Sequence, residues 1–422
     1  MAAESSRPNP RGPVDQRRLR FLFVYDAIYP QTLGGVEHRN HELASSLAKR
    51  GHEVVLAGWA DRSESPAAGV TILPIGKARK LHARSGRRST LQALRLAWHC
   101  ARLDIRGFDV VETSNIPFLH LFPLALRCRR ARVPLLVTWH EHWGLYWRQY
   151  MPPKGLGRWR LYAAIERRAA SRGNRAIAVS RLTADRVAVV RHDEVAVVPN
   201  GVPFERIRDL AERPPGSSEV IAAEAAPLVF AGRLIKEKRV DLLLDAVAIL
   251  ARSTPGLLLK IIGDGPERSS LLAQMKRLGL EESVDYAGRL PTSEAVWRHL
   301  GRAKVAVQPS AREGFGLFAL EAMAAGLPVV YCRSSESAIG ELVRDGVEGL
   351  EVLAEPSAIA AALDNLLADE EKLRDMAARA IERASGYDWD TAAAALIRIA
   401  HELVGERQQT SDGSLEQTQS DG

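Results

Sequence analysis

Two glutamates, Glu313 and Glu321, stand eight positions apart in the stretch PSAREGFGLFALEAMAAG, where an apolar strand pattern gives way to an apolar helix pattern. Glu313 is expected in the loop, and a helix is expected to begin near Leu317, which places Glu321 about one turn into it. Gly314 and Gly316 allow a tight turn that presents backbone amides to phosphate oxygens. Because each ionised carboxylate suits a pair of vicinal hydroxyl groups, the two glutamates are predicted to act at separate places along an extended ligand.

Two cations bracket another strand-to-helix turn. In FAGRLIKEKRVDLLLDAV, Arg233 follows an apolar strand pattern and Lys238 precedes a helix pattern. A guanidinium binds phosphate oxygens in a bidentate manner and an ammonium adds a compact charge, so the pair suits a diphosphate at a helix N-terminus. The same charges would stabilise a departing diphosphate. Lys236 and Arg239, in the same turn, are expected to be solvated.

The first half of the chain contributes His140, Gly34 and Gly35 as candidate site residues. His140 ends the strand pattern PLLVTWH, where an imidazole can hydrogen-bond a polar substrate or a developing charge. Gly34 and Gly35 open a helix after the first strand, where glycine lets backbone amides approach an anion or a sugar. A metal site is not predicted, because His140 and His142 would point to opposite faces of a continuing strand.

The elements that position these residues alternate between short apolar runs and longer segments of helical periodicity. This alternation predicts an α/β protein with two doubly wound, Rossmann-like domains that face a central cleft, the preferred ligand position in such sheets. The expected strands are 20–25, 53–58, 70–75, 109–113, 134–140, 175–180, 195–200, 227–232, 257–263, 283–288, 304–310, 328–332 and 349–352. The predicted boundaries are a first domain 18–210, a linker 211–226, a second domain 227–388, a final helix 389–405, and disordered tails 1–17 and 406–422.

The composition excludes several classes of protein. A hydrophobic fraction of 46% and a charged fraction of 26% exclude a disordered or fibrous chain. Three cysteines without metal-ligand spacing predict reduced thiols in a cytoplasmic compartment. No secretion signal is visible, and the apolar run 118–126 is about half as long as a membrane span. We therefore expect a cytoplasmic protein that does not cross a membrane.

Charge is distributed unevenly between the halves. Residues 1–215 hold 36 Lys and Arg against 19 Asp and Glu, whereas residues 216–422 hold 22 against 32. The basic excess is concentrated at 77–88, 127–132 and 158–168, and it would favour an anionic lipid leaflet or phosphate-bearing molecules, with merely solvated helix faces as the alternative. No nucleic-acid-binding module accompanies the charge, so nucleic acid is not an expected partner.

The motifs together resemble the retaining glycosyltransferases of family 4, which have the two-domain GT-B fold. The resemblance runs from about residue 20 to residue 404 and is strongest in REGFGLFALEAMAAGLPVV. Further matching segments are GGVEHRNHELASSLAKRGHEV, AVSRLTADRV, VVPNGV, AGRLIKEKRVDLLLDA, IIGDGPERSSL and GELVRDGVEGLEV. The resemblance implies that the C-terminal helix crosses back onto the first domain.

The resemblance also implies how the second domain holds a nucleotide sugar. Arg233 and Lys238 would hold its diphosphate, Glu321 the ribose hydroxyls and Glu313 hydroxyls of the transferred sugar. The backbone of the glycine turn would assist donor binding, at Gly314, Phe315, Gly316 and Leu317. The base would contact the turn after the strand 283–288, at Gly288, Arg289 and Leu290.

In the first domain, the resemblance places His140 near the anomeric centre and the C6 hydroxyl of the sugar, and Gly34 and Gly35 near the phosphates and the acceptor. His140, Arg233, Lys238 and Glu313 are then the expected catalytic residues. No metal and no cofactor are expected, since the nucleotide sugar is a co-substrate.

The activity implied is the transfer of a hexose, with retention, to a hydroxyl of a lipid-linked or polysaccharide or oligosaccharide acceptor in cell-envelope glycan assembly. This would occur in the cytoplasm, with the anionic inner face of the plasma membrane as a partner of the basic half. The alternatives are the same chemistry on a soluble small-molecule acceptor and an inactive nucleotide-sugar-binding subunit. A nucleotide-sugar epimerase is disfavoured by the segment from Glu313 to Glu321.

Two segments depart from the family pattern. Where the family has a glycine pair, this chain has CRSSESAIGE, with Ser334, Ser335 and Glu336. After His140 comes the aromatic and basic stretch EHWGLYWRQYMPPKGLGRWRLY. This stretch is compatible with an interfacial membrane element, an acceptor-binding wall or plain packing.

Overall fold

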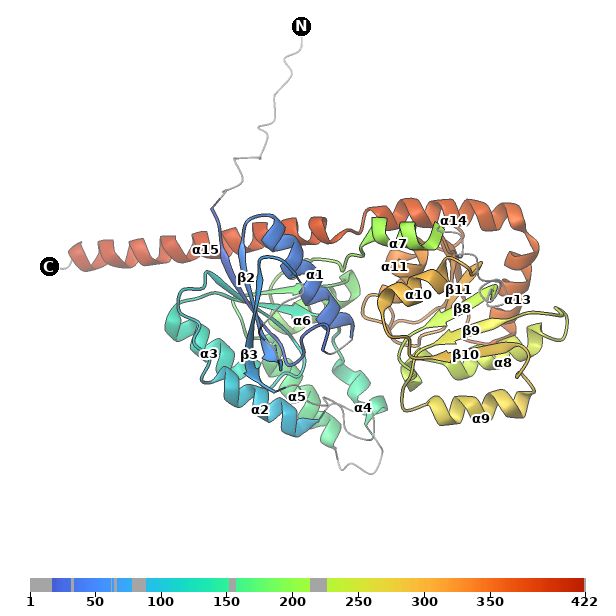
Figure 1. The fold of residues 1–422 in the computed structure, drawn as a ribbon. Coiled ribbons are helices and arrows are strands. Elements are labelled where there is room, and N and C mark those ends of the chain that lie inside the picture. Colours follow the sequence, from blue (N-terminus) through green and yellow to red (C-terminus); the bar gives the residue numbers. More distant parts are fainter. Residues whose placement is uncertain are drawn as a thin grey trace, which may run out of the picture.

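Two parallel β-sheets, each covered by helices on both faces, make up the computed structural model (Figure 1). The structure describes residues 17–31, 34–61, 63, 67–77, 89–151, 157–212 and 226–420, with side chains up to residue 407. Three predictions concern residues outside these ranges, namely the N-terminal tail up to residue 16, the linker 213–225 and the basic segment 78–88.

The first sheet contains seven strands in the order β3-β2-β1-β4-β5-β6-β7. Its central strands are buried apolar runs, as a sheet covered on both faces requires. Phe21 of β1 pairs with Val54 on one side and with Val110 on the other. The strands are β1 (Arg20–Val24), β2 (Glu53–Trp59), β3 (Val70–Gly76), β4 (Val110–Ser114), β5 (Leu135–Trp139), β6 (Arg175–Ala178) and β7 (Ala196–Val197).

The first sheet separates two apolar cores, one on each of its faces, and helices cover both. On one face, α1 (Gly35–Lys49) and α15 (Trp389–Ser420) pack together, with Leu43 and Leu396 among the buried side chains. The other face is covered by α2 (Thr90–Cys100), α3 (Leu121–Ala131), α5 (Arg158–Ala170) and α6 (Arg181–Arg191). The short turn η1 (Gly144–Tyr146) and α4 (Trp147–Tyr150) connect β5 to α5.

The second sheet contains six strands in the order β10-β9-β8-β11-β12-β13. They are β8 (Leu228–Ala231), β9 (Leu259–Ile262), β10 (Val284–Gly288), β11 (Val305–Gln308), β12 (Val329–Cys332) and β13 (Gly349–Val352). One face packs against α8 (Val240–Leu250), α9 (Arg268–Leu278) and α13 (Pro356–Ala368). The other packs against α10 (Ser293–Leu300), α11 (Leu317–Ala324), α12 (Ile339–Leu342) and α14 (Glu370–Ser385).

The chain crosses between the domains twice, at adjacent points. Val202 forms a bridge with Asp388, and its N–H donates to the carbonyl of Tyr387 at 2.9 Å. A Cβ on Gly201 would lie 2.6 Å from the backbone of Asp388, so a glycine is needed for this close approach. Beyond the first crossing, α7 (Phe204–Glu212) packs on α10 and α11 of the second domain.

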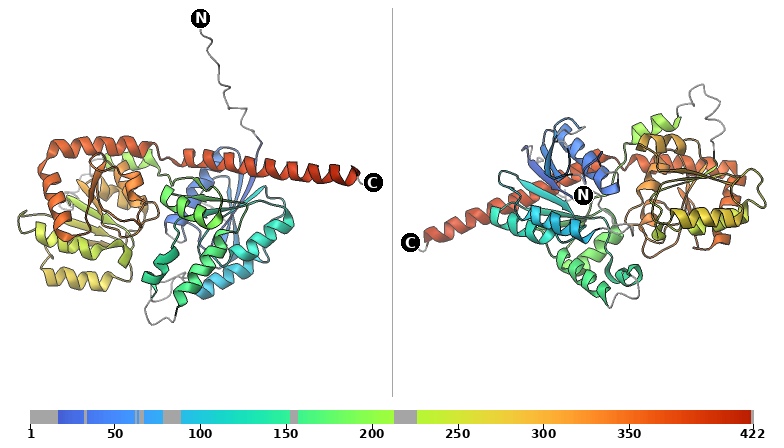
Figure 2. Two further views of the ribbon diagram at one scale, coloured as in Figure 1. Left: turned by 180° about the vertical axis from the view of Figure 1, so that it is seen from behind. Right: turned by 60° about the horizontal axis from the view of Figure 1, so that its bottom comes forward.

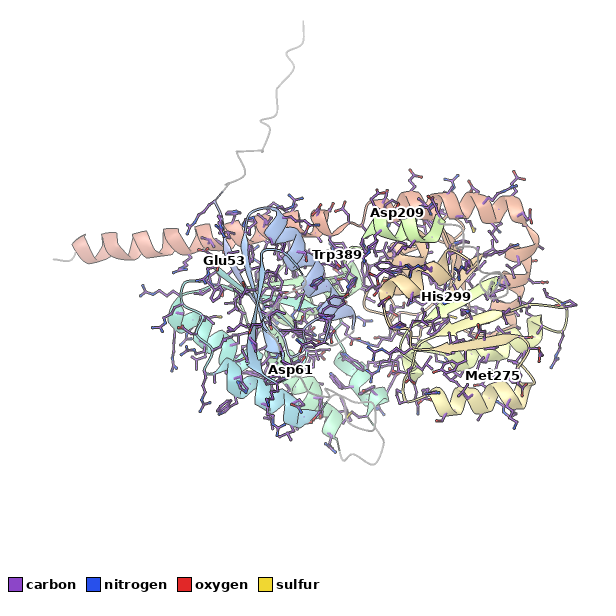
Figure 3. All side chains as sticks on the ribbon, viewed as in Figure 1. Glu53, Asp61, Asp209, Met275, His299 and Trp389 are labelled. Carbon is purple, nitrogen blue, oxygen red and sulfur yellow. The ribbon has the colours of Figure 1, made fainter. Side chains whose placement is uncertain are left out.

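The final helix, α15, returns to the first domain after the second crossing and runs along it in the views of Figures 1 and 2. Trp389, labelled in Figure 3, is buried at its start and meets the ring of His38 edge-on. The predicted crossing-back helix is therefore confirmed. The helix extends to Ser420, whereas the sequence predicted that it ends at residue 405 and that a disordered tail follows. No proline follows Trp389, so nothing in the covalent structure ends the helix earlier.

The predicted α/β fold with two doubly wound domains is confirmed, and a strand overlaps each of the thirteen predicted segments, with β2, β3 and β4 ending one residue later than predicted. The largest difference is at β7, where two residues pair with β6 instead of the expected six. Pro199 explains the early end of this edge strand, because proline lacks the N–H that a ladder requires.

Candidate functional site

A cavity of about 1050 Å³ lies between the two domains and receives side chains from both. It is lined by nine of the predicted site residues, which are Gly35, His140, Arg233, Lys238, Glu313, Gly314, Phe315, Gly316 and Leu317. The other predicted residues do not line it, and these are Gly34, Gly288, Arg289, Leu290 and Glu321. The fold therefore brings together groups that lie up to 282 positions apart in the chain.

The strand order explains why these residues meet. In each sheet the direction of winding reverses between two central strands, β1 and β4 in the first and β8 and β11 in the second. Loops that leave these strands diverge to opposite faces and leave a crevice at the carboxyl edge. Gly35 follows β1, Arg233 follows β8, and Glu313 follows β11. Both crevices open into the same cavity.

Lys238 and Glu313 form an ion pair in this cavity. The Lys238 ammonium donates to Glu313 Oε2, and the side-chain amide of Gln308 donates to the same oxygen at 2.8 Å. Both charged side chains are mostly buried, with 19% and 16% of their surfaces exposed. Arg233 also lines this cavity, and its side chain is exposed. Arg233, Lys238 and Glu313 thus place two cations and one carboxylate together. A ligand that carries both phosphates and hydroxyl groups could replace the contact between Lys238 and Glu313 with contacts of its own.

The helix after Glu313 begins at the predicted residue. α11 starts at Leu317, and Gly316 before it has a φ of 100°, a conformation that favours glycine. The first amides of a helix have no acceptor within it, so those that follow Gly316 can bind an anion in the cavity. The turn has the shape that the sequence predicts.

Glu321 lies one turn into α11, away from the cavity lining. Its Oε1 accepts a hydrogen bond from the indole N–H of Trp297 at 3.1 Å. Burial raises the pKa of Glu321 to about 7, because the ionised form loses hydration. The two glutamates therefore occupy separate environments, and their division between sugar and ribose hydroxyls stays a prediction.

On the first domain, main-chain and side-chain contacts fix the orientation of His140. Its Nε2 hydrogen-bonds the Ser114 hydroxyl at 3.1 Å, and its backbone N–H donates to Asn115 Oδ1 at 3.3 Å. Asn115 also donates to the carbonyl of Glu141 at 3.1 Å. Burial and the nearby Arg39 lower the pKa of His140 to about 3, so the imidazole is neutral at physiological pH.

A buried ion pair between Arg39 and Glu112 influences the protonation of His140. Arg39 of α1 and Glu112 of β4 are each 1% exposed, with their nearest charged atoms 3.9 Å apart. Glu112 also accepts a hydrogen bond from the Thr138 hydroxyl at 2.5 Å. The guanidinium lies below the cavity, where its positive charge disfavours protonation of His140.

Gly314 joins the second domain to the first by direct backbone packing. A Cβ on Gly314 would lie 2.0 Å from the carbonyl oxygen of His140, far closer than any side chain tolerates. The sequence predicts that Gly314 presents amides to phosphate, but the structure gives it a further role. The absence of a side chain lets the donor-side loop touch the end of β5.

Arg312, the neighbour of Glu313, crosses the domain boundary. It is 5% exposed, and its guanidinium donates to Glu141 Oε2 at 3.1 Å and to the His142 carbonyl at 2.8 Å, both in the first domain. It donates at 2.6 Å to Glu336 of the second domain. The planar group also lies 4.5 Å from the ring centroid of Trp143, a cation–π contact.

The segment that departs from the family pattern belongs to this network. Glu336 accepts hydrogen bonds from both terminal nitrogens of Arg186 in α6, at 2.8 and 3.0 Å. Arg186 also donates to the carbonyl of Ser335 at 2.7 Å, and the Ser334 hydroxyl donates to the Ala311 carbonyl at 2.6 Å. Ser335 and Glu336 therefore connect the domains through Arg186, while Ser334 holds the segment to the loop after β11 within the second domain.

The aromatic stretch after His140 packs beside the same network. Trp143 stacks on Trp147 at 4.8 Å, and Tyr150 meets Trp143 edge-on at 4.7 Å. Trp143, Tyr146 and Tyr150 line the cavity. Glu166 fixes the turn by accepting the backbone N–H groups of Trp143 and Gly144 at 2.8 Å each. The stretch thus combines packing with one wall of the cavity.

The residues predicted to meet the base lie at the end of β10. Gly288 has a φ of 67°, and its carbonyl accepts the N–H of Gly263 at 2.8 Å. Arg289 and Leu290 follow it at the carboxyl edge of the second sheet, outside the cavity lining. Gly34 caps α1 and contacts the Glu37 carboxylate.

Sequence reasoning missed several residues that shape the site. The principal ones are Arg39, Glu112, Ser114, Asn115, Arg186, Trp297, Gln308 and Arg312. A signal existed for Ser114 and Asn115, which follow an apolar strand just as His140 does. No sequence signal marks Arg312 or Arg186, because an ion pair between two domains leaves no local pattern in the sequence. Within the described part of the chain, no three His, Cys, Asp or Glu side chains form a group suited to a metal.

Two family models match the chain, one on each domain. Residues 33–206 match the model described as Glycosyltransferase Family 4. Residues 218–383 match the model described as Glycosyl transferases group 1. Together they span the second sheet, every strand of the first sheet after β1, and all of the cavity-lining residues predicted from the sequence.

Curated relatives match over about half of their own length. A D-inositol 3-phosphate glycosyltransferase of Nocardia farcinica is 35% identical over 214 residues, which is 49% of this chain and 47% of the relative. A glycogen synthase of Mycobacterium tuberculosis is 34% identical over 208 residues, 49% of this chain and 48% of the relative.

Solved structures share the fold over most of the chain. Anabaena HepE in complex with UDP and glucose has a TM-score of 0.68 at 20% identity, covering 91% of this chain and 100% of that one. A sucrose-phosphate synthase from Thermosynechococcus elongatus has a TM-score of 0.74 at 18% identity, covering 92% and 100%. WaaG, a glycosyltransferase involved in lipopolysaccharide biosynthesis, has a TM-score of 0.68 at 20% identity, covering 90% and 99%.

The contact between Gly314 and His140 can be tested by adding one methyl group. Gly314→Ala is expected to push the domains apart, because the new Cβ would overlap the His140 carbonyl oxygen. Small-angle scattering should give a larger radius of gyration than wild type, with an unchanged far-UV circular dichroism spectrum. Gly386→Ala, whose Cβ would lie 3.6 Å from its nearest neighbour, is the control. A radius unchanged in Gly314→Ala would contradict the packing role.

The Glu336 network makes a separate prediction about stability. Glu336→Gln leaves Arg186 and Arg312 without their shared counter-charge, so the free energy of unfolding should fall by about 1–3 kcal/mol. Glu351→Gln is the matched control, because Arg333 on the other side of that pair is 68% exposed and the loss should stay below about 1 kcal/mol. Thermal and urea unfolding measure both. Equal losses in the two variants would count against an interdomain role.

Proposed function

The chain belongs to the family 4, group 1 glycosyltransferases, and from this we propose that it transfers a hexose from a nucleotide sugar to a hydroxyl of a lipid-linked, polysaccharide or oligosaccharide acceptor, with retention and without an essential metal. The observation that carries the proposal is the Lys238–Glu313 pair beside Arg233, at the crevice where the second sheet reverses its winding. Structural neighbours with this fold are described as complexes with UDP, glucose and UDP-glucose.

The donor would enter by exchanging with the ion pair. Arg233 and Lys238 bind the diphosphate, and Glu313 is released from Lys238 to accept hydroxyl groups of the hexose. The side-chain amide of Gln308 donates a hydrogen bond to Glu313 Oε2 at 2.8 Å. This bond keeps the carboxylate in position during the exchange. The charges that pair with each other in this structure would therefore pair with complementary parts of the bound donor.

The remaining groups bind the two ends of the donor. Glu321, one turn into α11, would accept the ribose hydroxyls, and the turn at Gly288, Arg289 and Leu290 would meet the base. His140, neutral and held by Ser114, accepts or donates a hydrogen bond near the C6 hydroxyl and the anomeric carbon.

Charge separation is the step that the protein assists. The bond between the anomeric carbon and the diphosphate oxygen breaks, and its electron pair leaves with the nucleoside diphosphate. Arg233, Lys238 and the amides that follow Gly316 stabilise this negative charge without a metal ion. The oxygen of the acceptor hydroxyl bonds to the anomeric carbon from the face that the leaving group vacates, which gives retention, and its proton passes to the departing diphosphate oxygen. Turnover that depends fully on an added divalent metal would count against this scheme.

Two classes of acceptor are candidates for this transfer. A lipid-linked or glycan acceptor is supported by the arginine-rich outer helices of the first domain. A soluble small-molecule acceptor is supported by the D-inositol 3-phosphate glycosyltransferases, which match this chain at 33–36% identity over about half of its length. An inactive binding subunit is disfavoured, because the four expected catalytic residues all line one cavity.

Removing the Lys238 ammonium tests the proposed function directly. Lys238→Ala should lower the turnover of the nucleotide sugar by about 10²–10³, the usual effect of losing one group that stabilises developing charge. The donor is first chosen by thermal shift among UDP, GDP and ADP sugars, since a bound ligand raises the unfolding temperature. Lys276→Ala, an exposed lysine on α9, is the control. Wild-type turnover in Lys238→Ala would refute the assignment.

The raised pKa of Glu321 predicts a pH dependence of donor binding. At pH 6 the carboxyl, with a pKa of about 7, is mostly protonated, and at pH 8 it is mostly ionised and accepts both ribose hydroxyls. UDP-glucose affinity should therefore increase from pH 6 to pH 8 in wild type. Glu321→Gln, which cannot ionise, should show a flat profile over the same range by calorimetry. Parallel profiles for the two proteins would show that Glu321 does not govern the interaction.

A further inference from the structure

Helices α2, α3 and α5 cover the face of the first sheet opposite α15 (Figure 1), and their outer side is basic. The three helices contain eight arginines and a single acidic residue, Glu166. Glu166 is fully buried and points inward, where it accepts the indole N–H of Trp147 at 2.9 Å. The outer surface of these helices therefore carries positive charge without a compensating carboxylate of its own.

None of the eight arginines forms an ion pair in the part of the chain that the structure describes. They are Arg95, Arg127, Arg129, Arg130, Arg158, Arg160, Arg167 and Arg168. By contrast, arginines on the second domain, such as Arg344 and Arg379, pair with a glutamate or aspartate four residues away in sequence. The basic helices are thus distinct from an ordinary solvated surface, where charges of both signs alternate.

A stripe of large apolar side chains accompanies this charge on α2. Leu91, Leu94 and Trp98 are 55%, 54% and 53% exposed and recur at helical spacing along one side. The opposite side of the same helix supplies Leu96 and Cys100 to the core. α2 is therefore apolar on both sides; on its outer side Leu91 and Leu94 are exposed, whereas the Arg102 guanidinium lies 4.0 Å from the ring centroid of the half-exposed Trp98.

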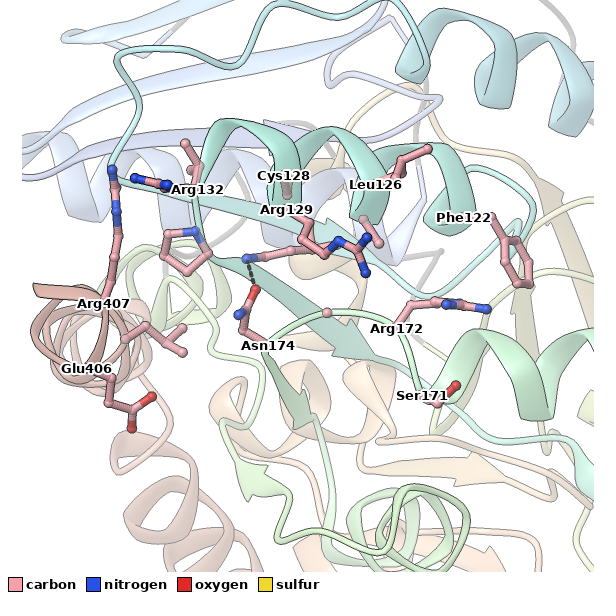
Figure 4. A pocket seen from close by; sticks show the side chains of 16 residues that line it. Phe122, Leu126, Cys128, Arg129, Arg132, Ser171, Arg172, Asn174, Glu406 and Arg407 are labelled. Atoms are coloured by element: carbon pink, nitrogen blue, oxygen red, sulfur yellow. Dashed lines mark hydrogen bonds between the residues drawn. The ribbon is translucent and has the colours of Figure 1, made fainter. Parts of the chain in front are cut away.

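The neighbouring helices continue the pattern. Leu126 of α3 is 42% exposed, and Leu161 of α5 is 60% exposed. Next to Leu126 a cavity of about 760 Å³ opens between the end of α3, the loop before β6 and α15 (Figure 4). Its lining combines Leu126 and Phe122 with Arg129, Arg132 and Arg172. It also includes Arg407 and the carboxylate of Glu406, which pairs with Arg175 at 2.8 Å. Figure 4 shows these basic side chains around the hollow.

We propose that the outer face of α2, α3 and α5 docks on an anionic lipid bilayer. Leu91, Leu94 and Trp98 would enter the interface between headgroups and acyl chains, as the apolar side of an interfacial helix does. The arginines would contact lipid phosphates, and the cavity beside Leu126 would hold one headgroup. Within the described residues no helix is long and apolar enough to cross a membrane, so the association is peripheral.

The chemistry of the face favours a bilayer over other occupants. A second copy docked symmetrically would bring two unpaired arginine clusters together and would meet repulsion. A nucleic acid would satisfy the arginines but would leave Leu91, Leu94 and Trp98 in water. An anionic bilayer offers phosphates at its surface and hydrocarbon a few ångströms below, which matches both parts of the face.

Docking would also place the cleft near lipid-linked acceptors, a step that rests on the proposed function. The turn Gly144–Tyr146 and α4 connect β5 to α5, and their side chains Tyr146 and Tyr150 line the cleft. Leu145 of that turn is 81% exposed. The aromatic wall of the cleft therefore lies on the segment of chain that precedes α5, one of the three helices of the docking face.

Vesicle sedimentation tests the docking with the full chain. Wild type should bind phosphatidylcholine vesicles in which a third of the lipid is phosphatidylglycerol, and should bind pure phosphatidylcholine vesicles far less. Leu91→Gln with Trp98→Gln should weaken this binding about tenfold or more, because it removes the inserted apolar area. Leu353→Gln with Ile249→Gln, two exposed apolar residues of the second domain, should bind like wild type.

A second pair of variants separates charge from insertion. Arg129→Glu with Arg130→Glu should weaken binding about tenfold or more, whereas Arg277→Glu with Arg374→Glu makes the same change in net charge on the second domain and should have little effect. Unchanged circular dichroism and an unchanged thermal shift with UDP-glucose confirm that the variants are folded. If wild type binds vesicles but neither binds nor turns over any nucleotide sugar, the proposed function is refuted and the docking proposal still stands.

Three outcomes would overturn the docking proposal. The first is equal binding to neutral and anionic vesicles, or binding to neither. The second is a dimer in solution that Leu91→Gln with Trp98→Gln dissociates, which would assign the face to a second copy. The third is tighter binding to duplex DNA than to the anionic vesicles.

Discussion

The packing of Gly314 against the carbonyl oxygen of His140 is the contact on which the cleft depends. It brings the loop that carries the charged donor-side residues onto the end of a strand in the other domain. A single Cβ at this position would lie 2.0 Å from that oxygen, so the two sheets can share a cavity only through a glycine. Arg312 then holds the approach with hydrogen bonds to Glu141 and to the His142 carbonyl.

Around this contact, charged side chains are arranged in pairs. Lys238 and Glu313 satisfy each other, and Glu336 satisfies Arg186 and Arg312 across the boundary. His140 stays neutral because burial and the positive Arg39 oppose its protonation. The first domain thus contributes a neutral imidazole, and the second contributes Arg233 and Lys238, the cations that a diphosphate requires. This division explains why neither domain alone would form the site.

Much of this arrangement could be predicted from the sequence, because its signals are local. Apolar runs gave the thirteen strands, and the glycines before Leu317 gave the start of α11. Residues at strand ends, such as His140, Arg233 and Glu313, were placed correctly in the cleft, since parallel strands bring their carboxyl ends to one edge. The interdomain contacts could not be predicted, because Arg312, Arg186 and Glu336 are neighbours only after both domains have folded. The helical extension beyond residue 405 was missed because a polar composition was interpreted as disorder.

The central claim is that Lys238 and Glu313 exchange their mutual ion pair for contacts with a nucleotide sugar. A crystal structure of the full chain with bound UDP-glucose measures this most directly. The account predicts that the Lys238 ammonium and the Arg233 guanidinium lie within hydrogen-bond distance of the diphosphate, and that Glu313 accepts hydroxyl groups of the glucose. A bound nucleotide outside the cleft, or one that leaves the Lys238–Glu313 pair intact, would contradict the account.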